Sequence, residues 1–209
     1  MGCPYRMTIR EKIENYWYYY KWHTLFALFV AILVGMWING TLKQKEVTFY
    51  AAFLNSMVTA EEELDLYIEG FYEQKNINSE IIIEDELIVD LDNIKELTTA
   101  ENLQVIITRM TCGELDLIEA DERTFKYYAE LETIADLRDV FDSEQFQELN
   151  NYIYYVDEIP VGLTLENASP EFKKNFLFLE SNPVIGIADM SENKEIVAEF
   201  LIYIFETEI

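Results

Sequence analysis

One apolar stretch, residues 22–38, divides the chain and limits what it can fold into. It contains no Asp, Glu, Lys or Arg, and at about 1.5 Å per residue a helix of this length just covers a hydrocarbon core. It is apolar on every side, whereas a helix at the surface of a soluble domain keeps one polar face. We therefore predict a transmembrane helix over 22–38, a short tip over 1–21, a linker over 39–46 and a separate domain over 47–209.

Flanking charges predict the orientation of this helix. Four basic residues precede it against two acidic ones, namely Arg6, Arg10, Lys12 and Lys21 against Glu11 and Glu14. By the positive-inside rule the tip is expected in the cytoplasm and the domain outside the cell membrane. The aromatic residues of 17–22 and Trp37 lie where two interfacial belts would form.

A cleaved signal peptide is the alternative to a retained anchor. Its apolar core usually spans about 7–15 residues and ends in small residues. Here the stretch ends in Met36, Trp37 and Ile38, which are bulky where a peptidase requires small side chains. The pattern favours an uncleaved signal anchor with the lipid bilayer as its first partner.

The region after the anchor is strongly acidic. Residues 46–209 hold 38 acidic and 9 basic residues, a net charge of −29, yet they are rich in Ile, Leu, Phe and Tyr. This composition indicates a folded domain with a real core and disfavours a disordered tail. Its charge repels nucleic acid and anionic lipid, so nucleic acid is not expected as a partner. A soluble surface explains this negative charge more simply than bound cations do, and cation binding stays open as an alternative.

Strands and helices are expected to alternate along this domain. Two Thr-x-x-Glu patterns, beginning at Thr59 and Thr98, resemble capping boxes, and Cys112 is expected in the core at the end of the second helix. Apolar β-rich runs predict strands at 47–54, 80–83, 115–120, 152–156, 161–165 and 184–188, with 86–90 either continuing the second strand or forming a hairpin with it. Helical spacing and start signals predict helices from 59 to about 74, from 98 to Gly113, from Asp121 to 128, over 143–150, from Ser169 onward and over 193–205. The expected fold class is α/β with a single mixed sheet.

Residues 110–121 and the following 125–137 resemble a run found in extracellular solute-binding proteins of the type 2 periplasmic fold. The matching positions are Gly113, Asp116, Ala129, Asp136 and Leu137. The resemblance implies that 115–120 is the third strand, passing a ligand cleft, and that the domain is similar to one lobe of that fold. The aromatic run before the anchor is similar to uncharacterised membrane-anchored proteins of low-GC Gram-positive bacteria.

No part of the sequence predicts a catalytic, metal or cofactor site. The single histidine, His23, lies in the apolar stretch, so the domain lacks histidine-based triads and zinc sites. Carboxylate pairs such as Asp90 and Asp92 leave a hydrolase open as a weaker alternative, although chance pairs are expected among so many carboxylates.

Topology gives the candidate ligand-binding residues. In open α/β sheets a ligand sits beyond the carboxyl ends of the strands, which selects Asn55 and Ser56 after the first strand and Asp121 after the third. We expect a non-catalytic, membrane-anchored binding or accessory domain, similar to a reduced solute-binding protein, with a small solute as ligand. The alternative is a structural or assembly protein that contacts a neighbouring membrane protein.

Overall fold

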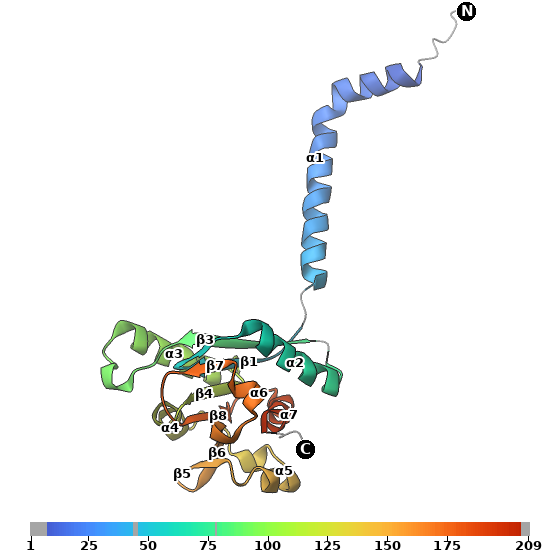
Figure 1. Cartoon of the computed structure of the whole chain (residues 1–209). Helices are drawn as coiled ribbons and strands as arrows, with labels where there is room; N and C mark the ends of the chain where they lie inside the picture. Colours follow the sequence, from blue (N-terminus) through green and yellow to red (C-terminus); the bar gives the residue numbers. More distant parts are fainter. Residues whose placement is uncertain (1–7, 44–45, 78, 206–209) are drawn as a thin grey trace, which may run out of the picture. The chain divides into compact units, whose positions relative to one another are not determined.

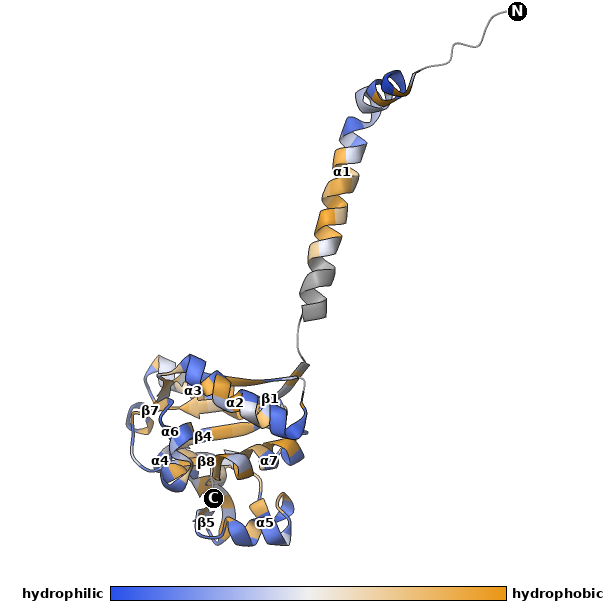
Figure 2. Cartoon of the chain, turned by 45° about the vertical axis from the view of Figure 1, so that its right-hand side comes forward, coloured by the Kyte–Doolittle hydropathy of each residue, from blue (hydrophilic) through white to orange (hydrophobic). Residues whose placement is uncertain are grey.

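The computed structural model describes residues 8–43, 46–77 and 79–205, which form two compact units, Met1–Lys45 and Glu46–Ile209. The first unit contains one helix, α1 (Ile9–Lys43). Its segment Tyr16–Met36 is long and apolar enough to cross a membrane, and none of it is buried (Figure 2). The helix runs beyond the predicted span at both ends, into the predicted tip and the first part of the predicted linker. Arg6, Lys45 and the side chain of Trp37 lie outside the described residues.

The second unit is built on a six-stranded mixed sheet (Figure 1). The first three strands in spatial order are parallel, and each later strand runs antiparallel to its neighbour. The spatial order is β3 (Ser79–Leu87), β1 (Glu46–Leu54), β4 (Leu117–Asp121), β8 (Pro183–Ile187), β6 (Ile159–Thr164) and β5 (Ile153–Val156). The predicted α/β class and mixed sheet are confirmed, and the run 86–90 continues the second strand only as far as Leu87.

Helices cover both faces of the sheet. One face packs against α2 (Glu61–Lys75), α6 (Pro170–Lys173) and α7 (Lys194–Phe205), with α5 (Ser143–Glu148) leading into the same core. The other packs against α3 (Leu97–Thr111) and α4 (Glu122–Glu130). Single-turn 3₁₀ helices lie at Leu91–Asn93 (η1), Leu137–Asp139 (η2) and Leu165–Asn167 (η3).

The alternation of side chains along the inner strands produces these two cores. The core on the side of α2, α6 and α7 is called the first core, and the core on the side of α3 and α4 the second. In β1, Phe49, Ala51 and Phe53 enter the first core, while Ala52 and Leu54 enter the second. All five are almost fully buried. A strand that is apolar on both faces belongs in the middle of a sheet with helices on both sides, which is where β1 lies.

Three local predictions were wrong. Helix α2 is capped at Ala60 without a side-chain cap, and the Thr59 hydroxyl donates instead to the carbonyl of Asn175 at 3.2 Å. Helix α3 is capped at Glu96, also without a side-chain cap, and Thr98 lies inside the helix. Cys112, expected in the core, is exposed. It follows the buried Met110 by two residues, which places it on the opposite side of the helix.

A second, two-stranded sheet was not predicted. It pairs β2 (Ser56–Val58) antiparallel with β7 (Phe176–Phe178). Each strand has only three residues, and the two lie more than a hundred positions apart in the sequence. Local residue patterns therefore carry little signal for this sheet, which we call the ribbon.

Candidate functional site

The fold has a topological switch point between β1 and β4. After β1 the chain passes through α2 on one face of the sheet, and after β3 it passes through α3 on the other face. The first connection leads from β1 to β3 and the second returns from β3 across β1 to β4, since β3 and β4 flank β1. Helices diverging from adjacent carboxyl ends open a crevice there, the usual ligand position in open α/β sheets.

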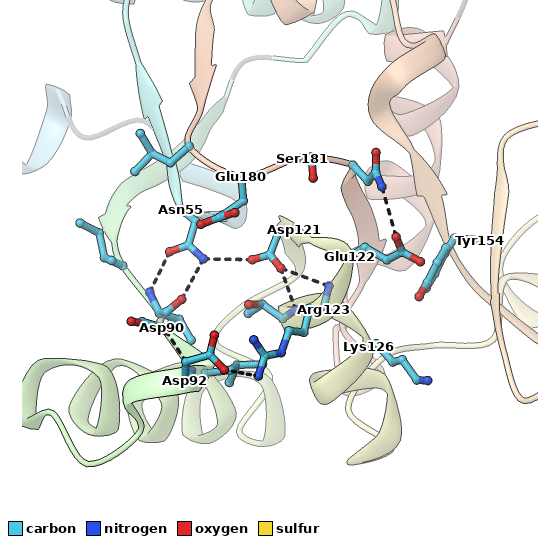
Figure 3. A pocket seen from close by; sticks show the side chains of 16 residues that line it. Asn55, Asp90, Asp92, Asp121, Glu122, Arg123, Lys126, Tyr154, Glu180 and Ser181 are labelled. Atoms are coloured by element: carbon cyan, nitrogen blue, oxygen red, sulfur yellow. Dashed lines mark hydrogen bonds and ion pairs between the residues drawn. The ribbon is translucent and has the colours of Figure 1, made fainter.

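A cleft of about 690 Å³ lies at this edge of the sheet (Figure 3). That volume falls within the range of small-molecule sites. Four segments supply the walls: the turn after β1, the segment after β3, the start of α4 and the loop before β8, joined by one side chain from β5. The lining residues are Asn55, Ile88–Asp92, Asp121–Thr124, Lys126, Tyr154 and Leu179–Asn182.

Asn55 ties three of these segments together. Its side chain accepts from Val89 N at 2.8 Å and donates to Val89 O at 2.9 Å and to an Asp121 carboxylate oxygen at 3.0 Å. Its own carbonyl accepts from Leu179 N at 2.8 Å. The residue is only 7% exposed, so Asn55 forms the floor of the cleft. Its side-chain amide already has protein partners.

Asp121 ends β4 and begins α4. One carboxylate oxygen accepts from Arg123 N at 3.1 Å and Thr124 N at 3.0 Å, which makes it the N-cap of the helix. The other oxygen accepts the Asn55 amide. The structure therefore brings two of the three predicted residues into direct contact at the cleft floor. Their role in binding a ligand stays a prediction.

Ser56, the third predicted residue, does not line the cleft. Its hydroxyl donates instead to the Glu119 carboxyl at 2.5 Å. Both side chains are almost fully buried. Burial raises the pKa of Glu119 to about 8, with Ser56 opposing the shift and Asp121 adding to it. This pair lies beneath the site, facing away from it.

An ion pair crosses one side of the cleft. Arg123 on α4 donates to Asp92 of η1 at 2.7 Å, which lowers the pKa of the Asp92 carboxyl. Asp90 caps η1 by accepting from Asp92 N at 2.9 Å and from the Asn93 amide at 2.6 Å. These bonds fix the segment after β3 against α4.

The opposite side is less constrained. Glu122 accepts from the Asn182 amide at 3.3 Å, and Tyr154 lies beside it (Figure 3). Partial burial, followed by the Glu122 charge, raises the pKa of the Tyr154 hydroxyl. Among the described residues Glu180 has no cationic partner within salt-bridge distance. Free polar groups beside an aromatic ring are suited to hold a polar solute.

Most of these lining residues were not predicted from the sequence. Arg123 and Glu122 directly follow Asp121, so extending the predicted strand end by one helical turn would have found them. Tyr154 and residues 179–182 reach the cleft only through long-range strand pairing, which no local motif marks. Within the described ranges no group of three or more His, Cys, Asp or Glu side chains is arranged to hold a metal ion.

Comparison with known proteins gives one loose likeness. No family model and no curated protein matches the sequence. Among solved structures the chain is similar to an extracellular solute-binding protein family 1 from Alicyclobacillus acidocaldarius, with 15% identity and a TM-score of 0.32. The likeness covers 58% of this chain and 28% of that one, so the chain spans less than a third of that protein. Both implied relationships, to a solute-binding lobe and to the Gram-positive group, stay predictions.

Proposed function

We propose that this chain is a membrane-anchored, extracytoplasmic binding domain, similar to a reduced solute-binding protein, that holds a small polar solute without transforming it. The observation that carries the proposal is the cleft at the switch point of the sheet. It has the position and volume of a ligand site, its floor is fixed by the Asn55–Asp121 contact, and its walls keep polar groups such as Glu180 available.

A non-catalytic role fits the chemistry of the lining. The two floor residues are engaged in structural hydrogen bonds, and the carboxyl with the strongly raised pKa, Glu119, faces the core side. The domain holds no histidine. These features leave the cleft with groups for binding and without an evident nucleophile–base pair.

Native mass spectrometry of the full chain, released from detergent, tests this function. A co-purified small molecule, or a thermal shift with one member of a solute library, is the expected result. A chain that carries no added mass and shows no shift across sugars, amino acids and amines would contradict solute binding. It would favour the assembly role, in which the exposed apolar helix α1 contacts a neighbouring membrane protein.

External protease on intact cells tests the orientation. If residues 47–209 lie outside the cell membrane as proposed, added protease should remove the acidic domain and leave a short anchored fragment. Detergent-lysed cells are the control for protease access. Full protection of the domain on intact cells, with cleavage after lysis, would contradict the proposed topology.

A further inference from the structure

The ribbon has one buried and one exposed face. Phe176 and Phe178 turn inward and pack on the first core, whereas Met57 and Leu177, which are cross-strand partners, are each 52% exposed. Leu179, two residues after Leu177, is 48% exposed. Leu179 directly follows β7 and donates its N–H to the carbonyl of Asn55, the residue before β2, so Met57, Leu177 and Leu179 adjoin one another and form what we call the outer ribbon face.

This face is continuous with the rim of the cleft. Leu179 lines the cleft and donates its N–H to Asn55 O at 2.8 Å. Ile88 is 56% exposed and also lines the cleft. It precedes Val89, whose N–H donates to the Asn55 side chain, so it lies on the other side of Asn55 from Leu179. Single exposed apolar residues are ordinary. Four on adjoining strand ends make a patch of the kind that marks an interaction surface.

Charge decides which partner can cover the patch. Glu180 directly follows Leu179, and Asp90 lies two residues after Ile88, so carboxylates border the apolar side chains at the cleft. The domain carries a net charge of −29. A second copy of this chain and an anionic lipid surface would both meet like charge at close range.

We propose that the outer ribbon face and the adjoining cleft rim dock a basic amphipathic segment of a partner protein. Its apolar side chains cover Met57, Leu177 and Leu179, and its Lys or Arg groups reach Glu180 and Asp90. Apolar anchors give the affinity, while the carboxylates select the partner. This surface goes beyond the proposed solute function and does not depend on it, since docking at the rim can be measured with no solute bound.

The test uses the full chain in phosphatidylcholine nanodiscs and fluorescent peptides that alternate Leu with Lys, Leu with Glu, or Ser with Lys. The Leu–Lys peptide should bind, and the other two should bind far more weakly. In the double variant M57Q/L177Q we expect affinity to fall at least about tenfold, as for loss of central apolar anchors. The matched control M190Q changes a methionine that is 58% exposed and lies three residues after β8, and it should leave binding unchanged.

Two outcomes would overturn the docking surface. One is equal binding of the Leu–Lys peptide to the wild type and to M57Q/L177Q. The other is equally tight binding of the Ser–Lys peptide, because charge alone would then explain the interaction. A photo-cross-linking Leu–Lys peptide on the wild-type chain keeps the test valid if the double variant is unstable. Cross-links should fall on Met57 and residues 177–180, and cross-links confined to other elements would contradict the proposal.

Discussion

At the scale of single residues, Asn55 decides how the site is held together. It adopts the left-handed conformation, with a φ of 53°, which Asn tolerates better than most residues. Its amide then extends the strand pairing of β1 by bonding both N and O of Val89. One residue thus ends β1, fixes the segment after β3 and joins Asp121.

Substitutions at Asn55 should separate the effect of its left-handed backbone conformation from the effect of its amide hydrogen bonds. N55G keeps the backbone conformation but leaves the Val89 groups without their partners, so we expect a loss of about 1–3 kcal/mol in the free energy of unfolding. N55A adds the left-handed strain of about 1–2 kcal/mol. Urea unfolding of the chain followed by circular dichroism measures both. Equal stability of N55G and the wild type would show that the amide bonds contribute nothing.

Glu119 should make stability depend on pH. Its folded pKa of about 8 lies above the ordinary value of 4.5, so the folded state binds the proton more tightly than the unfolded state. The associated stability is fully present below about pH 4.5 and is lost as pH rises through about 8. E119Q mimics the protonated carboxyl and cannot ionise, so its stability does not fall as pH rises through about 8.

We expect E119Q to match the wild type near pH 4.5 and to exceed it by about 3–5 kcal/mol well above pH 8, at about 1.4 kcal/mol per pKa unit. Comparing the two proteins at each pH cancels the other titrating groups. Urea midpoints across this range give the measurement. A stability difference that does not change with pH would rule out a protonated Glu119 at neutral pH.

At the scale of elements, α4 approaches the sheet closely because two facing strand positions are glycine. A Cβ at Gly186 of β8 would lie 2.6 Å from the Phe125 ring and 2.7 Å from Val161 O. A Cβ at Gly162 of β6 would meet the same ring at 2.8 Å. The position of α4 against the sheet depends on this close packing. Arg123 lies on α4, so the cleft wall that it forms depends on the same packing.

G186A should therefore lower the free energy of unfolding by about 1–3 kcal/mol through overpacking against backbone. G70A in α2 is the matched control. Its Cβ would meet only the hydroxyl end of Tyr203, and alanine favours the helix, so a smaller effect is expected. Thermal unfolding of both variants compares them. An equal loss of unfolding free energy in both variants would show that close packing of Phe125 on Gly186 contributes no more to stability than the Gly70 position does.

Elements with their own local signal were predictable, and those held by distant partners were not. The apolar, β-rich run of β1 and the Asp121 start of α4 were read correctly from the sequence. The ribbon and the start of α2 depend on partners such as Asn175, far along the chain. For the same reason Asn55 and Asp121 were found at the cleft, while Tyr154 was not.

At the scale of the whole molecule, the chain joins an exposed apolar helix to an acidic domain with two cores of its own. None of the α1 side chains that the structure describes belongs to either core, and the segment Tyr16–Met36 meets the length and apolarity of a membrane span. We propose that the helix determines where the domain acts and that the cleft determines what it binds.

Occupancy of the cleft by a solute tests that account most directly. S181W places a large ring on an exposed cleft residue without touching either core. Native mass spectrometry of the wild type and of S181W, purified side by side, should show a bound small molecule in the wild type and none in S181W, with both proteins folded. The same added mass in both proteins, or none in the wild type, would contradict the cleft as the solute site.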